Sequence, residues 1–354
     1  MLAFTEKVYG KKSSSGSTYL VGDIGGTNST FAFVEEKENT LILLVTLHYK
    51  SKEISDFTSI VKEVVSGGEK KYNFHPTAAC FAGAGVVSEK NDHCTITKLA
   101  WNIDARKIER KTSLRSVLII NDFIAVAYGI EKVSAQNRVV LKSGKLVPCK
   151  PKVILGAGTG LGKAILIWNN KSNRYFPVAS EGGHSDAALQ VQEEFEFAEF
   201  IKKKYARVRV VWEDMLSGKG ISNIYQFLES VGKYSSSKYS LQIKKSNYDP
   251  ALISTFQQDS QCKATLDIFL RVYARCAQNL ALDTVALGGI YLAGGITAKN
   301  VSLFKRKAFI DEFILNHRMK KVLEQIPIFA ITDYNVSLYG AAHALKLYLQ
   351  GEFP

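Results

Sequence analysis

Residues 21–30 read Val-Gly-Asp-Ile-Gly-Gly-Thr-Asn-Ser-Thr, a glycine-rich stretch between two apolar runs. Apolar runs lie directly before it, at Tyr19–Val21, and after it, at Phe31–Val34, so its glycines are predicted to turn one strand into the next. Glycine also lets the backbone come close to a bound ligand. Asp23 and Thr27 add a carboxylate and a hydroxyl beside exposed backbone N–H groups. The loop therefore suits a nucleotide phosphate with its metal ion.

A second glycine-rich stretch, Gly156–Gly162, matches neither of two common phosphate-binding patterns. The Walker pattern G-x-x-x-x-G-K-[ST] fails because Ala157 replaces its first glycine and Ala164 its final hydroxyl residue. The dinucleotide pattern G-x-G-x-x-G opens a helix, whereas here a strand-like apolar run, Ala164–Trp168, follows. The stretch thus repeats the strand, turn, strand order around residues 21–30. Two such hairpins predict two related halves, each offering a loop to the same cleft.

The composition is that of a globular chain. At 354 residues, 46% of them hydrophobic, it is long enough to bury a sizeable core in two domains. The sequence has no run of about 18 apolar residues, and its first residues lack a basic segment followed by an apolar one. The five cysteines never occur as Cys-x-x-Cys, which disfavours a disulfide framework and a structural zinc site. We therefore expect a cytoplasmic protein without a membrane span, with organelle import left open.

The formal net charge of +13 raises the question of a nucleic acid partner. The lysines are spread along the chain, and the densest groups, Lys202–Lys204 and Lys244–Lys245, are typical of solvated helix faces or loops. We therefore expect no nucleic acid partner. Attraction of an anionic nucleotide is a milder interpretation, and solubility alone is milder still.

Short β-rich runs alternate with helical stretches, which predicts an α/β chain. We expect strands at 18–23, 29–35, 41–48, 78–82, 115–120, 152–155 and 163–168, and helices at 55–65, 123–129 and 339–349. Asn121 and Asp122 follow a buried strand, so the aspartate falls in the first turn of the next helix. Residues 232–248 are predicted to form a surface excursion between helices, and residues 10–17 a polar, flexible leader.

Three glycine-containing segments together resemble the sugar-kinase branch of the actin-like ATPase superfamily. Gly22–Asn28 and Gly156–Gly160 resemble its two phosphate loops, and Ala293–Ile296 resembles its adenosine loop. Within that branch the chain is most similar to the bacterial-type glucokinases, a family that also occurs in some protists. The matching blocks extend over residues 18–345, nearly the whole chain.

This resemblance implies an α/β, two-domain fold of the actin-like ATPase (ribonuclease H-like) type, with a cleft between a small and a large domain. The small domain is expected at 18–132 plus 338–354 and the large domain at 133–337, because chains of the family cross back in that way; residues 1–17 are the leader. The implied reaction is ATP-dependent phosphorylation of glucose at its 6-hydroxyl with Mg²⁺, and the implied assembly is a homodimer.

The sugar-side motifs of the family are matched, in its order, by Ile120–Phe123, Glu181–His184 and Glu213–Gly218. By this resemblance the sugar is bound by Asn102, Asn121, Asp122, Glu181, His184 and Glu213, and Asp122 accepts the proton of the attacking hydroxyl. The chemistry agrees, because carboxylates, amides and an imidazole give orienting hydrogen bonds to pyranose hydroxyls. The nucleotide side comprises Asp23, Gly25, Gly26, Thr27, Asn28, Gly158, Thr159, Gly160, Gly294 and Gly295, with Asp23 holding Mg²⁺ through water.

Each of these residues also has a purely structural interpretation. Asn121 and Asp122 can simply cap a helix, Glu181–His184 can be an ordinary turn, and Glu213 can be an exposed helix charge. Glycine hairpins also serve chain reversal alone. The joint occurrence of these segments in one order favours function. Four other histidines, at 48, 75, 93 and 317, lack such a context and are interpreted as structural or exposed.

The chain departs from the family pattern in three places. Lys219 stands where many members have the proline of Leu-Ser-Gly-Pro-Gly. Residues 82–87 replace a Gly-Pro or Cys-Pro type of segment, and Trp101-Asn102 matches a sugar-side loop only loosely. These departures leave open the nucleotide or cleft contact near Lys219 and the sugar contact of Asn102.

Rival functions make different demands on the sequence. A kinase of the repressor-and-kinase family, acting on glucose, N-acetylmannosamine or a related hexose, would carry a cysteine-rich zinc motif after the Gly-His segment, but no cysteine lies between Cys149 and Cys262. A transcriptional regulator of the same ancestry would need a helix-turn-helix before the first loop, where only 17 residues precede Thr18. A chaperone or filament-forming ATPase would not need the sugar-side motifs. Another hexose or an amino sugar as substrate, and ADP or polyphosphate as donor, stay open.

Overall fold

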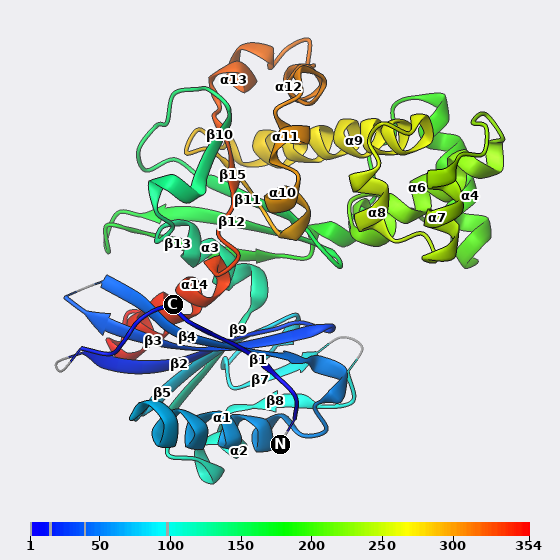
Figure 1. Ribbon diagram of the computed structural model, residues 1–354. Helices are drawn as coiled ribbons and strands as arrows, with labels where there is room; N and C mark the ends of the chain where they lie inside the picture. Colours follow the sequence, from blue (N-terminus) through cyan, green and yellow to red (C-terminus); the bar gives the residue numbers. More distant parts are fainter. Residues whose placement is uncertain (1, 14–15, 39, 97–98) are drawn as a thin grey trace. The chain divides into compact units, whose positions relative to one another are not determined.

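The computed structural model describes residues 2–13, 16–38, 40–96 and 99–354. The chain divides into two compact units. Unit 1 comprises Met1–Ser134 and Asn335–Pro354, and unit 2 comprises Ala135–Tyr334. The chain thus leaves unit 1 after residue 134 and returns to it with its last helix (Figure 1).

Unit 1 is built on a six-stranded mixed sheet in the order β1-β4-β3-β2-β5-β9. The strands are β1 (Thr5–Val8), β2 (Ser17–Ile24), β3 (Asn28–Lys37), β4 (Thr40–Lys50), β5 (Ala78–Gly83) and β9 (Ser116–Asn121). Adjacent strands among β4, β3 and β2 are antiparallel, whereas β5 and β9 run parallel to β2. Ile24 pairs with Ser29 across the glycine turn, which confirms the predicted hairpin.

The leader expected at residues 1–17 includes a strand, so the prediction of a flexible segment was wrong in this part. Thr5–Val8 pair antiparallel with Val45–His48 at the edge of the sheet. The strand has only four residues, Thr-Glu-Lys-Val, without the apolar alternation that signals a strand locally. The long β4 supplies its hydrogen-bonding partner. Residues 14–15 of the same leader lie outside the described residues.

Helices cover both faces of this sheet, because successive side chains of its strands point to opposite faces. One hydrophobic core joins the sheet to α1 (Phe57–Tyr72) and α2 (Ala105–Lys111). The other joins it to α3 (Asp122–Ile130) and α14 (Val336–Leu349). The remaining elements are β6 (Gly85–Val87), β7 (His93–Ile96) and β8 (Asn102–Asp104), which form a small sheet, and the 3-10 turn η1 (Ser51–Glu53).

The helices α3 and α14 cross in close contact at a glycine. A Cβ atom added at Gly340 of α14 would lie 1.7 Å from the carbonyl oxygen of Ala125 in α3. Only glycine allows the two backbones to approach so closely. The crossing holds α3, whose first residue is Asp122, between the sheet and the C-terminal helix.

Unit 2 contains a second six-stranded sheet in the order β10-β15-β14-β11-β12-β13. Its strands are β10 (Arg138–Lys142), β11 (Lys152–Ala157), β12 (Leu161–Asn169), β13 (Arg174–Ser180), β14 (Ile290–Ala293) and β15 (Ile328–Ile331). An antiparallel hairpin, β11-β12, again lies beside two parallel strands, β14 and β15. This repeats the arrangement of β2-β3 beside β5 and β9, as expected for two related halves.

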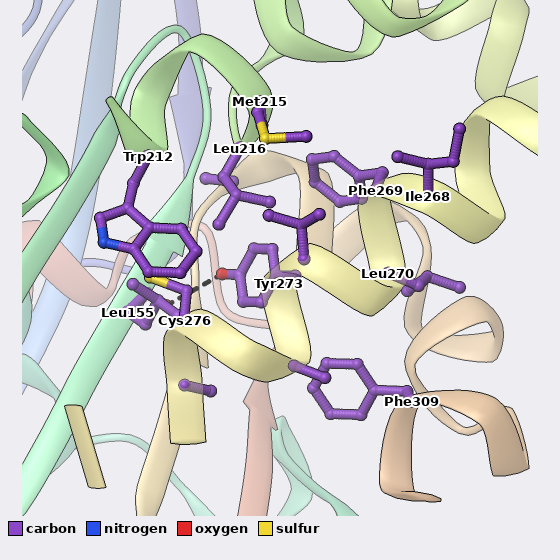
Figure 2. Close-up of a cluster of buried hydrophobic side chains, with 14 of the residues drawn as sticks. Leu155, Trp212, Met215, Leu216, Ile268, Phe269, Leu270, Tyr273, Cys276 and Phe309 are labelled. Atoms are coloured by element: carbon purple, nitrogen blue, oxygen red, sulfur yellow. Dashed lines mark hydrogen bonds between the residues drawn. The ribbon is translucent and has the colours of Figure 1, made fainter. Parts of the chain in front are cut away.

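The core of unit 2 gathers around the long helix α9. The helices are α4 (Gln192–Tyr205), α5 (Trp212–Met215), α6 (Gly218–Val231), α7 (Lys238–Lys245), α8 (Pro250–Thr255), α9 (Ser260–Thr284), α10 (Gly295–Lys299), α11 (Val301–Phe304), α12 (Lys307–Ile314) and α13 (Lys320–Gln325), with the 3-10 turns η2 (Ala135–Asn137) and η3 (Gly182–His184). Figure 2 shows Tyr273 of α9 among Trp212, Met215 and Leu216. Its hydroxyl donates to the Leu155 carbonyl oxygen at 3.3 Å, which fastens α9 to β11.

The excursion expected at residues 232–248 contains a short helix, α7, between α6 and α8. Ser237 caps this helix by accepting from the backbone N–H of Ser240. Among the described residues, no helix is both long and apolar enough to cross a membrane.

Candidate functional site

A buried serine, Ser51, stabilises the first glycine turn by hydrogen bonds. Gly25 N–H donates to the Asn28 carbonyl oxygen at 3.0 Å and closes the turn. Ser51 donates its hydroxyl to the Gly25 carbonyl oxygen at 2.6 Å and its N–H to the Thr27 carbonyl oxygen at 3.0 Å. The side chains of Thr27 and Asn28 are exposed. The turn is thus held rigidly by its carbonyl groups while the predicted phosphate-binding side chains face solvent.

Asp23 lies on β2 just before this turn. Ser337, at the start of α14, donates its hydroxyl to Asp23 Oδ2 at 2.5 Å. Burial raises the pKa of the Asp23 carboxyl, and the hydrogen bond from Ser337 opposes that rise. A bound cation would favour the charged form in the same way.

The residues around Asp23 fit magnesium in one specific manner. No cluster of three or more histidine, cysteine or acidic side chains among the described residues could hold a metal ion. Mg²⁺ is usually held by one or two carboxylates together with substrate phosphates and water. A single carboxylate, that of Asp23, beside a phosphate-type turn matches this mode of Mg²⁺ binding. It does not match a site in which all metal ligands come from the protein.

Asn121 and Asp122 lie where β9 ends and α3 begins. Asn121 Oδ1 accepts from the backbone N–H groups of Phe123 at 2.9 Å and Ile124 at 3.3 Å, so it caps the helix. Asp122 Oδ1 accepts from Phe123 N–H at 3.0 Å. The positive end of the helix dipole stabilises a carboxylate there. The structural interpretation is therefore correct for the Asn121 carbonyl group, and it leaves a half-buried Asp122 carboxyl beside it.

Asn102 belongs to the same region of unit 1. It pairs with Thr95 of β7, and the neighbouring Trp101 is buried and stacks on Phe57. Burial and the nearby Asp122 carboxylate raise the pKa of the Cys94 thiol, also on β7, to about 12. Strand β7 therefore brings the loosely matched Asn102 into the neighbourhood of Asp122. The Asn102 side chain itself is exposed.

The second glycine turn, in unit 2, is held by two hydrogen bonds from one motif, one from its backbone and one from a side chain. Gly218 N–H donates to the Gly158 carbonyl oxygen at 2.8 Å, and Glu213 Oε2 accepts from Leu161 N–H at 3.0 Å. A Cβ atom at Gly160 would lie 2.5 Å from Glu213 Oε2, so only glycine admits this carboxylate. The motif Glu213–Gly218 is thus part of the phosphate-type turn as well as a predicted sugar motif.

Glu181 directly precedes the 3-10 turn η3, His184 is its last residue, and both are exposed. His184 Nε2 lies 4.0 Å from Glu181 Oε2. The Trp212 N–H donates to the Ser185 carbonyl oxygen at 3.1 Å, which fastens the segment after η3 to α5 and hence to Glu213. The three predicted sugar ligands of unit 2 therefore come from segments that contact one another around the start of β12.

The third predicted element, Gly294-Gly295, begins α10 at the end of β14. Gly294 has a φ of +87°, and a Cβ atom there would lie 2.6 Å from the Ala157 carbonyl oxygen. The adenosine-type segment thus packs against the end of β11, where the second glycine turn starts. Thr159, at the tip of that turn, is exposed.

The sequence-predicted residues therefore form two groups. Unit 1 carries Asp23, Gly25, Gly26, Thr27, Asn28, Asn102, Asn121 and Asp122, and unit 2 carries Gly158, Thr159, Gly160, Glu181, His184, Glu213, Gly294 and Gly295. Sequence reasoning missed Ser51 and Ser337, which hold the first turn and Asp23. Neither serine lies in a recognisable local pattern. Lys219, the departure from the family motif, stacks its ammonium over Tyr205 at 4.1 Å from the ring centroid.

Two sheets, each with an antiparallel hairpin beside two parallel strands and a glycine turn at the hairpin's end, define an α/β protein of the actin-like ATPase fold. The glucokinase family model matches residues 20–348. Glucokinase from Nostoc punctiforme is 35% identical over 337 residues, which cover 91% of this chain and 97% of that protein. The chain therefore belongs to the glucokinase family.

Solved structures share this fold. Glucokinase from Balamuthia mandrillaris, in complex with glucose, matches with a TM-score of 0.79 at 22% identity, over 95% of each chain. A ROK family glucokinase from Streptomyces griseus, in complex with glucose and AMPPNP, matches with a TM-score of 0.62 at 18% identity, over 93% of this chain and 99% of that one.

Proposed function

We propose that this protein transfers the γ-phosphoryl group of ATP to the 6-hydroxyl of D-glucose. The observation that carries the proposal is the junction of hydroxyl-binding side chains with a phosphate-type turn in unit 2. Glu213 is fixed to the second glycine turn by its Oε2 atom. The segment of Glu181 and His184 is held to the helix of Glu213 through the hydrogen bond between Ser185 and Trp212. Membership of the glucokinase family supports the same reaction.

Asp122 is proposed as the general base. The glucose O6 forms a bond to the γ-phosphorus, the bond from that phosphorus to the β–γ bridging oxygen breaks, ADP leaves, and Asp122 takes the O6 proton. Because phosphoryl transfer has a loose transition state, the proton moves late and the base mainly orients the hydroxyl. A strongly raised pKa is therefore not needed. The start of α3 keeps Asp122 charged for this role.

The other polar residues are proposed to orient the sugar. Asn102, Asn121, Glu181, His184 and Glu213 supply amide, imidazole and carboxylate groups, which pair with hydroxyls as donors or acceptors. The Oε2 atom of Glu213 accepts from Leu161 N–H, so we assign its Oε1 atom to a glucose hydroxyl. One carboxylate then bridges the sugar and the phosphate-type turn.

The glycine turns are proposed to hold the nucleotide. Their residues are Gly25, Gly26, Thr27 and Asn28 in unit 1 and Gly158, Thr159 and Gly160 in unit 2, with Gly294 and Gly295 toward the adenosine. Backbone N–H groups and hydroxyls of such turns suit phosphate oxygens. Asp23 would hold Mg²⁺ through water, and the metal, when bound, offsets the charge that develops on the transferred phosphoryl group.

A homodimer in the cytoplasm is the assembly and location that we propose from the family resemblance. Sedimentation equilibrium over a range of protein concentrations tests the first, and fractionation of cells with an antibody against the chain tests the second. A monomer would contradict the first proposal, and a signal confined to an organelle would contradict the second. Neither result would contradict the proposed reaction.

A coupled assay tests the function most directly. Purified protein is given glucose, mannose, fructose or glucosamine with ATP, ADP or polyphosphate, and formation of the hexose 6-phosphate is followed. We expect glucose with ATP to give the highest kcat/KM. A higher kcat/KM with mannose or glucosamine would indicate that this other sugar is the substrate. ATP hydrolysis without transfer to any sugar would support a non-sugar ATPase instead.

A further inference from the structure

Unit 2 contains a cavity of about 330 Å³ that none of the residues proposed for sugar or nucleotide lines. Its lining comes from β12, the segment after η3, α5 and the C-terminal part of α9. The polar residues are Lys163, Ser185, Asp186, Asn279 and Asp283, and the apolar ones are Trp212, Leu280 and Leu282. The volume lies near the lower end of the range for small-molecule sites, about 300–1,000 Å³. The cavity is therefore large enough for a small organic molecule.

Lys163 is the unusual residue of this cavity. It sits on β12 between Leu161 and Ile165, on the face of the strand that packs against the core around α9. Its side chain is only 6% exposed. Among the described residues, no carboxylate forms an ion pair with its ammonium and no oxygen accepts a hydrogen bond from it. A core-facing strand position thus holds a cation where an apolar side chain would cost less.

The neighbours of Lys163 do not supply a counter-charge. Its ammonium lies 5.3 Å from the centroid of the Trp212 ring. Burial raises the pKa of the neighbouring Cys276 thiol to about 11, and the charge of Lys163 together with its hydrogen bond to this thiol opposes that rise. The thiol is therefore a neutral partner near pH 7 and brings no negative charge to the ammonium. Burying an ammonium without an anionic partner costs free energy. A group in the cavity with a negative charge would remove that cost.

The same cavity also carries negative charge. Asp186 and Asp283 line it and are exposed. Asp283 lies in the last turn of α9, which ends at Thr284, and the C-terminal end of a helix attracts cations. The charge of Asp186 is shared with Arg209 at 3.4 Å. Asp283 makes no ion pair with any other residue that the structure describes.

We propose that this cavity binds a small zwitterion, of the class of α-amino acids, with its carboxylate on Lys163 and its protonated amine on Asp283. Ser185 and Asn279 line the cavity as neutral hydrogen-bonding groups, and Trp212 is its apolar wall. A doubly charged phosphate ester would satisfy Lys163 but meet the two aspartates. A diamine would satisfy the aspartates but meet Lys163. Only a ligand with both charges complements both the lysine and the aspartates of the lining.

Binding can be measured without any kinase assay, so failure here is distinguishable from failure of the proposed reaction. Glycine, L-serine and L-glutamine serve as probes in calorimetric titrations, with Trp212 as a fluorescent reporter in parallel. At least one probe is expected to bind one to one with a dissociation constant on the order of 1 mM. Acetate and ethylamine, which each carry one of the two charges, should bind at least about tenfold more weakly. Absence of saturable binding by all three amino acids, or equal binding of either half-ligand, overturns the proposal.

Two variants and one matched control locate the site. Lys163→Met keeps a long, flexible side chain in the buried position but removes the ammonium, and it should abolish binding. Lys152→Met is the control, because Lys152 on the adjacent strand also places its ammonium over an aromatic ring, that of Tyr175, at 3.9 Å, outside the cavity. This control should bind like the unchanged protein.

Asp283→Asn removes the charge at the other end of the ligand. Because Asp283 is exposed, this variant should fold normally, and it should weaken amino acid binding by about tenfold or more. It decides the question even where Lys163→Met does not fold, as judged by circular dichroism. Unchanged binding in Asp283→Asn overturns the assignment of the amine.

Discussion

Two aspartates of unit 1 occupy opposite electrostatic settings. Asp122 begins α3, where the helix dipole and the Phe123 N–H favour its charged form. Asp23 lies on β2, where burial raises its pKa against the hydrogen bond from Ser337. A base that only orients a hydroxyl does not need a raised pKa, whereas the charged form of Asp23 would gain further stabilisation from a bound cation. The two residues therefore call for different tests.

Asp122→Asn should lower kcat by about two to four orders of magnitude. Asparagine keeps the size of the side chain and can still accept from Phe123 N–H, so the fold and the affinity for glucose should change little. The measurement is steady-state kinetics together with glucose binding by calorimetry in the absence of ATP. A kcat near that of the unchanged protein would remove Asp122 as the base.

Asp23→Asn should raise the thermal stability while lowering the use of Mg-ATP. The native pKa of Asp23 lies above its unfolded value, so its carboxyl favours the folded state at low pH and loses that contribution as the pH rises through the native pKa. The gain in melting temperature should therefore be absent below the ordinary pKa of aspartate and grow as the pH increases. Melting curves from pH 3 to pH 8 and the KM for ATP provide the measurement; a gain independent of pH would contradict this cause.

Glu213→Ala should impair both substrates, because the carboxylate holds the second glycine turn through Leu161 N–H as well as being assigned to the sugar. Glu181→Ala is the matched comparison, since Glu181 is exposed and belongs to the sugar group alone. We expect the KM for glucose to rise in both variants and the KM for ATP to rise only in Glu213→Ala. An unchanged KM for glucose in either variant would contradict its assignment.

At the scale of elements, each phosphate-type turn is a rigid hairpin end held from outside by another segment. Ser51 bonds the carbonyl groups of the first turn, and Glu213 with Gly218 bonds the second. The two hairpins have the same strand order, but unrelated segments hold their turns. The helices that carry the remaining side chains are set by packing, most tightly where Gly340 of α14 meets Ala125 of α3.

Gly340→Ala should destabilise unit 1 by about 1–3 kcal/mol or more, because the new methyl group meets the α3 backbone. Gly67→Ala is the matched control within α1, where a Cβ atom has no neighbour within 4 Å. That control should stabilise the protein by about 0.5–1 kcal/mol, since alanine is the better helix former. Urea unfolding gives both values, and equal effects of the two substitutions would rule out the tight crossing.

The hairpins and the Asn121-Asp122 junction could be predicted because each lies within one short stretch of chain. Strand, turn and strand, or strand, cap and helix, carry their signals in consecutive residues. The hydrogen bonds that hold the first turn and Asp23 could not be predicted, because Ser51 and Gly25 are 26 residues apart and Ser337 and Asp23 are 314 apart. Strand β1 was not predicted for the same reason, since its formation depends on pairing with the distant β4. The sugar-binding residues are predicted only through resemblance to the family, and they stay a prediction.

At the scale of the whole molecule, the two units have separate cores. The core around α9 consists of residues of unit 2 alone, and the two cores on the faces of the first sheet consist of residues of unit 1 alone. Unit 1 is discontinuous in sequence, because α14 fills one of its two cores from the far end of the chain. The core of unit 1 is therefore complete only when the last residues of the chain are present, whereas all core residues of unit 2 precede them.

A truncated chain ending at Tyr334 should leave unit 2 folded and unit 1 largely unfolded. Loss of α14 exposes the sheet face that bears Ala32 and Val34 and removes the partner of α3, so Asp122, the proposed base, loses its support. Hydrogen exchange followed by mass spectrometry should find fast exchange in β2, β3 and β5 and protection in β11, β12 and α9. A chain ending at Gln350, which keeps all of α14, is the control and should stay protected throughout. Protection of β2 and β3 in the shorter chain would mean that unit 1 folds without its C-terminal helix.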